Sequence, residues 1–237
     1  SNFFIAIDRG EIEFEIDNAD IKINKNTLSN WFSNSEVEKA TLENNQNDEF
    51  LFSKNLFKCH TSPNHVEHKT DIPNLGPVRL LILVDESMPK RVCLFRNGMK
   101  ISDHLAYFGE HFSRFKLAKN FIALYEPLSD LGSKLIKTLE NPQHDGLSAA
   151  RLSNEGKRKI ATKAIKELAA FVRDKIKQET YFKASDEIEL TELNEFFPDI
   201  ERLDDKSDDE GESNPMKIKI KPLKKKIKVI EKPHFNP

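Results

Sequence analysis

The stretch Val78-Arg79-Leu80-Leu81-Ile82-Leu83-Val84 is the part of the chain that best indicates the fold. It is almost continuously apolar, and it lies between Gly76-Pro77 and Asp85-Glu86-Ser87, which are residue types common in turns. A short apolar run with such borders is typical of a buried strand, because both of its faces can pack against other elements. The sequence therefore predicts a sheet whose interior includes residues 78–84.

Two stretches after this run are also predicted to be strands. Arg91-Val92-Cys93-Leu94-Phe95 follows a turn that contains Pro89, so we expect it to form a hairpin with residues 78–84. Asn97-Gly98 then supplies the next turn. Phe121-Ile122-Ala123-Leu124-Tyr125 is a short apolar run and a further candidate strand.

The region before the central run has less regular patterns. Segment 3–24 holds two extended stretches, and in Glu11-Ile12-Glu13-Phe14-Glu15-Ile16 the alternation of apolar and acidic residues predicts a strand with one buried face. From Asn26-Thr27 to about Ala40 the apolar spacing predicts a helix. Residues 41–73 are polar and irregular, and we expect them to be mostly loop.

Two helices are predicted after the strands. Residues 131–139 have apolar side chains at helical spacing, and this helix must end before Pro142. Residues 154–178 carry the strongest helical pattern of the chain, with basic residues mainly off the apolar stripe. The stripe is formed by Ile160, Ala164, Ile165, Leu168, Val172 and Ile176.

The C-terminal region changes character twice. Residues 201–214 are strongly acidic with almost nothing to bury, which predicts a disordered linker. In residues 215–237 lysines alternate with apolar residues, as in the first strand of a further domain or in a Lys-rich tail. For residues 1–200 we therefore expect an α+β domain, with a mixed β-sheet covered by helices, a long helix, and a flexible charged tail beyond it.

Composition excludes several classes of protein. The chain has 237 residues, of which 38% are hydrophobic and 32% charged, so it can form a sizeable core beneath a charged surface. No apolar run reaches the roughly 18 residues of a membrane span, and no signal peptide is evident, so the expected location is the cytoplasm. The net charge of −2 leaves any attraction to nucleic acid to local patches.

The segment from Cys59 to His68 contains side chains that can bind metal. Cys59, His60, His65 and His68 are ligand types that hold zinc. However, no CxxC half-site is present, and spacing is what makes such a pattern specific. The sequence favours a polar loop here, and no metal is expected. With only two cysteines, Cys59 and Cys93, we expect reduced thiols.

No complete active site can be identified in the sequence. His144-Asp145 is a metal-binding or acid–base type of pair, but no second cluster of ligands accompanies it. A Walker-type glycine loop and a nucleophile-elbow serine are both missing from the sequence. These motifs therefore supply no self-sufficient active site.

Basic residues accompany the second predicted strand. Lys90, Arg91, Arg96 and Lys100 flank this strand and the turn after it, so several cations could reach one edge of the sheet and contact phosphate oxygens. The alternative is an ordinary solvated hairpin. The helix at 154–178 and the Lys-rich tail present similar basic surfaces, which could neutralise nucleic-acid phosphates.

Four short blocks, taken together, resemble bacterial histidine-kinase-like (GHKL) ATPases. The blocks are Phe3-Phe4-Ile5-Ala6-Ile7-Asp8-Arg9-Gly10-Glu11-Ile12-Glu13-Phe14, Leu75-Gly76-Pro77-Val78-Arg79-Leu80, Phe95-Arg96-Asn97-Gly98-Met99-Lys100-Ile101 and Glu140-Asn141-Pro142-Gln143-His144-Asp145. The resemblance is to MutL-like and MORC-like members that accompany helicases and nucleases in restriction or anti-phage defence. It covers roughly residues 3–178.

The resemblance implies a role within a larger ATPase. In that family ATP and Mg are bound by a module that precedes the matched region, and nothing here resembles that module. What remains is similar to the transducer domain, a β-α domain of a ribosomal-protein type that supplies a cation to the γ-phosphate. Lys100 or Arg96 is the implied phosphate contact, and Lys90 is a third possibility. The implied partners are the chain's own ATPase module, a second copy in a homodimer, and DNA.

Two other readings remain at this stage. The chain could be a non-catalytic interaction module that recruits a helicase or nuclease through its apolar helix or Lys-rich tail. A metal-dependent enzyme using the segment from Cys59 to His68 is the third. For the block from Glu140 to Asp145 we expect a structural role, because Pro142 ends a helix and Asn141, His144 and Asp145 can cap the connection to the next.

Overall fold

The apolar run at 78–84 lies in β4 (Gly76–Val84), an interior strand of the main sheet. The computed structural model describes residues 2–16, 21–113, 115–143 and 145–181. Among these residues, five strands form one sheet in the order β3-β4-β7-β5-β6. The other strands are β3 (Val66–Ile72), β5 (Arg91–Arg96), β6 (Met99–Ser102) and β7 (Phe121–Pro127).

The sheet is mixed, as predicted, but β4 and β5 are not neighbours in it, although we expected them to form a hairpin. β4 pairs antiparallel with β3 and β7, whereas β5 pairs parallel with β7 and antiparallel with β6. The predicted hairpin between 78–84 and 91–95 is therefore wrong. Every residue of β7 is buried, so β7 takes the interior position and separates β4 from β5.

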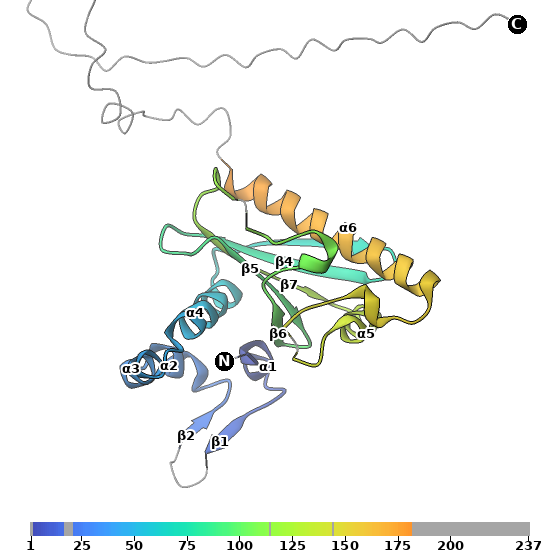
Figure 1. The fold of residues 1–237 in the computed structure, drawn as a ribbon. Coiled ribbons are helices and arrows are strands. Elements are labelled where there is room, and N and C mark those ends of the chain that lie inside the picture. Colours follow the sequence, from blue (N-terminus) through green and yellow to red (C-terminus); the bar gives the residue numbers. More distant parts are fainter. Residues whose placement is uncertain (1, 17–20, 114, 144, 182–237) are drawn as a thin grey trace, which may run out of the picture. The chain divides into compact units, whose positions relative to one another are not determined.

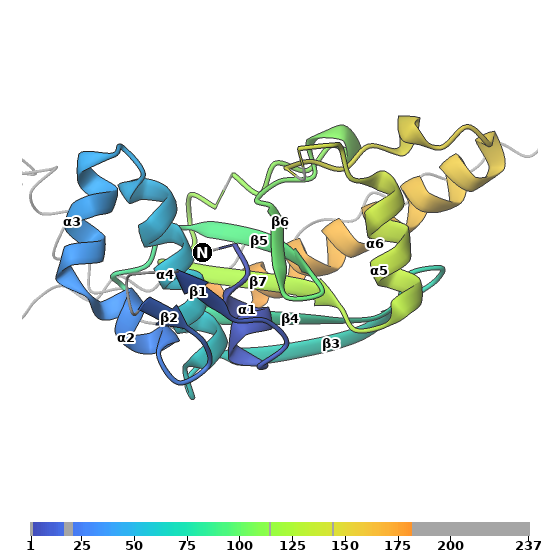
Figure 2. The same ribbon diagram turned by 90° about the horizontal axis from the view of Figure 1, so that it is seen from below.

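Helices cover both faces of the sheet (Figure 1). On one face lie α5 (Asp130–Leu139) and α6 (Glu155–Thr180). On the other lie α1 (Phe4–Asp8), α2 (Leu28–Ser33) and α4 (Asn47–Thr61), with α3 (Ser35–Glu43) beside α4, as Figure 2 shows. The predicted α+β fold, a mixed sheet covered by helices with a long C-terminal helix, is thus confirmed.

The two apolar layers explain the continuous apolar run of β4. Leu80 and Ile82 belong to the cluster under α5 and α6, whereas Leu81 and Leu83 belong to the cluster under α1 and α4. Successive side chains of a strand point to opposite faces of the sheet. A strand between two helical layers must therefore be apolar at both odd and even positions.

The prediction of a loop over 41–73 is wrong. This region forms α4 and the edge strand β3. The short apolar stretches 50–52 and 56–57 lie on this helix, and Phe52, Leu56 and Cys59 recur at helical spacing and are all buried on one face of it. β3 is polar because it lies at the sheet edge and only Ile72 within it is fully buried.

The N-terminal region also departs from expectation. Its first extended stretch is instead the short helix α1, and the strand predicted at 11–16 is shorter, β1 (Phe14–Ile16), paired with β2 (Ile21–Ile23). The expected buried face is missing at Phe14, which is 45% exposed.

The helix predicted from Asn26-Thr27 to Ala40 is two helices, α2 and α3. They are separated at Asn34, whose Oδ1 accepts a hydrogen bond from the Glu36 backbone N–H at 2.8 Å. Asparagine is a favoured N-cap because its side chain satisfies a free amide of the first turn, so α3 begins afresh after it.

The two later helices are confirmed, and both have capped N-termini. Ser129 Oγ accepts from the Gly132 amide at 3.1 Å, and Asn154 Oδ1 accepts from the Lys157 amide at 2.9 Å. Of the predicted stripe on α6 only Ile160 is exposed. Among the described helices, none is long and apolar enough to cross a membrane. The predicted linker and tail at 201–214 and 215–237, and the domain boundary at 200, lie outside the described residues.

Candidate functional site

The turn between β5 and β6 is the meeting point of the first, third and fourth of the blocks that carry the sequence resemblance. Gly98 has φ +71°, and an added Cβ would lie 2.6 Å from the Ala6 backbone nitrogen of α1. The Lys100 amide donates to the Asn2 carbonyl oxygen at 2.7 Å. The first block therefore packs directly on the third, and only glycine at position 98 permits this approach.

Arg96 joins the same turn to the fourth block. Its Nη2 donates to Glu140 Oε2 at 3.0 Å, and its Nε donates to Glu140 Oε1. The two side chains are 11% and 1% exposed. Beside them Ser133 Oγ of α5 donates to Asn97 Oδ1 at 2.8 Å. Arg96 is therefore committed to a buried, two-pronged ion pair at the end of α5.

A second buried carboxylate connects the first block to the second. Glu126 of β7 is 1% exposed, and its Oε1 accepts from Arg9 Nη2 at 2.6 Å and from Arg79 Nη2. Arg9 follows α1, and Arg79 lies on β4. Two guanidinium groups on one carboxylate compensate its removal from water. This cluster ties α1 to the centre of the sheet.

Lys100 lies on the opposite face of the hairpin from α5, against α4. Its Nζ forms an ion pair with Glu49 and lies 5.2 Å from the centroid of the Phe52 ring. The Lys100 side chain is 11% exposed, whereas that of Glu49 is 55% exposed. Burial lowers the pKa of Lys100 to about 8, and the carboxylate of Asp103 opposes this shift.

Lys90 lies apart from Arg96, in a hollow at the start of β5. The hollow has a volume of about 340 Å³. Arg91, next to Lys90, donates to Asp103 Oδ2 at 2.8 Å and stacks on Phe52, with 3.4 Å between its Cζ and the ring centroid. The described residues that line the hollow are Lys90, Arg91, Val92, Asp103, His104, His111, Phe112 and Ser113.

The structure therefore separates the three candidate phosphate contacts. Arg96 holds Glu140 on the α5 side, Lys100 holds Glu49 on the α4 side, and Lys90 faces the hollow. Lys100 and Arg91 come together, because both lie against the ring of Phe52.

The four residues of metal-binding type do not converge. Cys59 is in the core, its Sγ donates to the Ile122 carbonyl oxygen at 3.6 Å, and burial raises its pKa to about 12. His60 Nε2 lies 3.2 Å from Asp8 Oδ2, and His68 Nε2 lies 3.0 Å from Glu179 Oε1. Within the described part of the chain, no three His, Cys, Asp or Glu side chains lie close enough together to hold a metal. His65 is therefore not part of such a group either.

The block from Glu140 to Asp145 forms a closed connection after α5. Asn141 Nδ2 donates to Asp145 Oδ1 at 2.5 Å, and the Asp145 amide donates back to Asn141 Oδ1 at 3.1 Å. The Asn141 amide also donates to the Gly146 carbonyl oxygen at 3.0 Å. These contacts agree with the expected capping role of Asn141 and Asp145, while His144 is outside the described residues.

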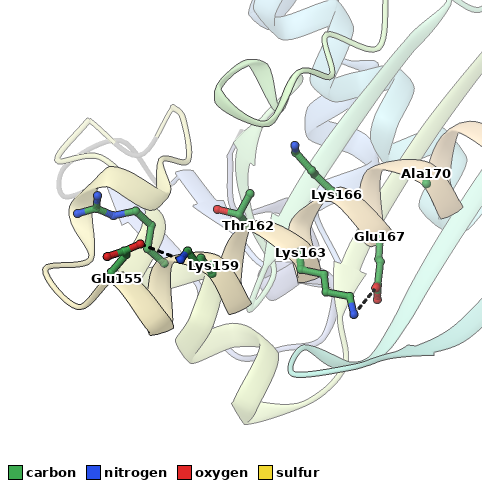
Figure 3. Close-up of a pocket in the computed structure, with 8 residues that line it drawn as sticks. Glu155, Lys159, Thr162, Lys163, Lys166, Glu167 and Ala170 are labelled. Atoms are coloured by element: carbon green, nitrogen blue, oxygen red, sulfur yellow. Dashed lines mark ion pairs between the residues drawn. The ribbon is translucent and has the colours of Figure 1, made fainter.

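A second hollow, of about 680 Å³, runs along one flank of α6 (Figure 3). Its described lining is confined to this helix, and pairs along the helix hold much of its charge. Lys159 pairs with Glu155 at 2.8 Å and Lys163 with Glu167 at 3.9 Å. Lys166 also projects from this flank in Figure 3. The residues of the apolar stripe of α6 from Ala164 to Ile176 are buried against the sheet, whereas most residues of this flank are exposed.

Comparison with known proteins identified no relative of this chain. No protein-family model matches the chain, and neither a curated protein nor a solved structure similar to it was found.

Proposed function

We propose that the chain is the non-nucleotide-binding, transducer-like part of a GHKL-type ATPase. In this proposal it couples ATP binding and hydrolysis in a neighbouring module, which holds ATP and Mg, to dimer closure and to engagement of DNA or a protein partner in a defence system. One observation supports it above all. The four blocks that resemble the family lie far apart in the sequence, yet three of them are in direct contact at the β5–β6 turn, and Glu126 links the first block to the second.

These contacts offer a physical route for coupling. α1 is held by the close approach of Gly98 and by the Arg9–Glu126–Arg79 cluster, so a displacement of α1 must also move the β5–β6 turn. The β5–β6 turn is joined to the end of α5 by the ion pair between Arg96 and Glu140. Packed elements transmit such a displacement as a unit, because protein interiors are close-packed.

Among the three candidate cations, Lys100 is the one we assign to the γ-phosphate. Its partner Glu49 is more than half exposed, so water can solvate that carboxylate when Lys100 turns to a phosphate. Arg96 instead makes two hydrogen bonds to the buried carboxylate of Glu140, so moving Arg96 to a phosphate would break a buried ion pair. A cation placed on the γ-phosphate stabilises the charge of phosphoryl transfer.

The exposed apolar residues near the N-terminus suit a contact with the ATPase module. Phe3, Phe14 and Ile21 are 38%, 45% and 45% exposed, and the rings of Phe3 and Phe14 lie 6.3 Å apart between centroids. Grouped exposed apolar side chains are typical of interaction surfaces. The two free, buried cysteines fit the proposed location in the cytoplasm.

ATP hydrolysis by the full-length protein that carries this chain tests the proposal. Lys100→Ala should lower kcat by about tenfold or more, because a transition-state cation is lost, while the Kd for ATP stays within about threefold. Lys116→Ala removes an exposed cation elsewhere in the domain and should leave both unchanged. Full turnover in Lys100→Ala would exclude Lys100 as the contact, and a wild-type protein without ATPase activity would refute the proposal as a whole.

The second candidate function is an interaction module that recruits a helicase or nuclease. The observation that favours it is the hollowed flank of α6, where alkyl stems and charged ends of several side chains face outward (Figure 3). Recruitment through the apolar stripe of α6 is not available, because that stripe is part of the core.

A further inference from the structure

We propose that the hollow at the start of β5, lined by Lys90, Arg91, His104, His111 and Ser113, binds the phosphate group of a small phosphorylated ligand. This site is distinct from Lys100, and it does not depend on the proposed ATPase function. The hollow could bind a phosphorylated ligand even if the chain never contacts ATP.

The charge of the hollow favours an anion. Of its residues only Asp103 is acidic, and Arg91 already pairs with that carboxylate. Within the described part of the chain Lys90 has no ion-pair partner, and it is partly buried at the rim. A lysine ammonium in this situation is a compact cation with its donors free for phosphate oxygens.

The remaining polar groups of the hollow are donors suited to phosphate. The rings of His104 and His111 lie 6.4 Å apart between centroids, so the two imidazoles are close enough to contact the same phosphate group. Ser113 adds a hydroxyl, and imidazole, hydroxyl and ammonium groups can all donate to the same set of phosphate oxygens. Three segments of the chain contribute these groups, which makes the hollow more specific than a row of surface lysines.

The back wall of the hollow is held in a strained conformation. Phe112 has φ +47°, which is rare and unfavourable for a bulky residue. The Phe112 amide donates to Glu110 Oε1 at 2.7 Å, and the Glu110 carboxylate also accepts hydrogen bonds from Arg173 of α6. Strain that neighbouring contacts impose in this way is typical of ligand sites.

A buried hydroxyl lies behind this wall. The Tyr125 ring packs against Phe112 with 5.9 Å between centroids, and Tyr125 is fully buried. Among the described residues its hydroxyl has no hydrogen-bond partner, although a buried hydroxyl normally has one.

The size of the hollow limits the ligand. Small-molecule sites usually measure about 300–1,000 Å³, and the hollow lies at the lower end of that range. It accommodates a phosphate group with a small organic part. Free phosphate and a nucleoside monophosphate share this chemistry, and they can be distinguished by experiment.

Titration of the 237-residue chain with inorganic phosphate and with AMP, at constant ionic strength, tests the proposal. Calorimetry gives the affinity, and NMR of the imidazole groups locates the ligand. We expect phosphate to shift the His104 and His111 signals, Lys90→Ala to weaken binding by about tenfold or more, and Lys90→Arg to restore it. Tighter binding of AMP than of phosphate would identify a nucleotide site, and equal binding a site for the phosphate group alone.

Lys116→Ala is the matched control, because Lys116 lies in the same β6–β7 connection as His104 and His111 but does not line the hollow. It should bind phosphate as the wild type does. The proposal is overturned if millimolar phosphate leaves both histidine signals unchanged, or if Lys90→Ala and Lys116→Ala weaken binding equally.

Discussion

At the scale of single residues, two glycines with a left-handed backbone differ in what surrounds them. Gly98 and Gly109 have φ of +71° and +83°, but an added Cβ meets the Ala6 backbone at Gly98 and nothing within 4 Å at Gly109. Gly109→Ala should therefore cost only the backbone penalty, about 1–2 kcal/mol. Gly98→Ala should cost roughly 3 kcal/mol or more, since overpacking against α1 is added.

Urea unfolding of the two variants measures this difference in the free energy of unfolding. The contact between the β5–β6 turn and α1 is what the comparison isolates, because the backbone penalty is common to both positions. Equal losses in the two variants would show that α1 does not press on Gly98, and the coupling route proposed above would lose its first step.

At the scale of elements, the connection between β6 and β7 is held to α6 by Glu110 and Arg173. Burial by itself would raise the pKa of Glu110, but hydrogen bonds from Arg173 and from the Phe112 amide outweigh it and lower the pKa. A lowered folded-state pKa contributes stability above the unfolded pKa, and this stability is lost as the pH falls through the folded pKa.

Glu110→Gln should consequently lower the free energy of unfolding by about 1–2 kcal/mol at neutral pH. The gap to the wild type should begin to narrow as the pH falls below the ordinary glutamate pKa of 4.5, and it should close only below the lowered pKa of folded Glu110, where that side chain is also uncharged. Urea unfolding across that pH range is the measurement. A gap that stays constant with pH would contradict a contribution from the ionised carboxylate.

The elements that could be predicted from sequence are those with a one-dimensional pattern. β4 and α6 were predicted because a continuous apolar run and a regular stripe follow directly from burial on two faces or one. α4 was missed because polar residues such as Asn55 and Lys58 alternate with its apolar residues along the chain, its buried face includes the polar Ser53, and the region around it is polar. The position of β7 between β4 and β5 depends on pairing between distant segments, and no local pattern contains it.

The same limit applies to the candidate site. Lys90, Arg96 and Lys100 could be selected as cations near one strand, but their partners could not. Glu140 and Glu49 are two of 39 acidic residues, and only the fold reveals which of these acids is buried against an arginine. The hollow beside Lys90 also requires His104 and His111 from a later loop, for which the sequence contains no motif.

At the scale of the whole molecule, the central claim is that nucleotide binding elsewhere in the full-length protein is transmitted through α1 to the β5–β6 turn. Hydrogen exchange measured on that protein, with and without a non-hydrolysable ATP analogue, tests this claim most directly. We expect the analogue to increase protection in residues 4–8 and 95–101, to leave the edge strand at 66–72 unchanged, and to have no such effect in Lys100→Ala. Unchanged protection of both segments in the wild type, although the analogue binds, would contradict it.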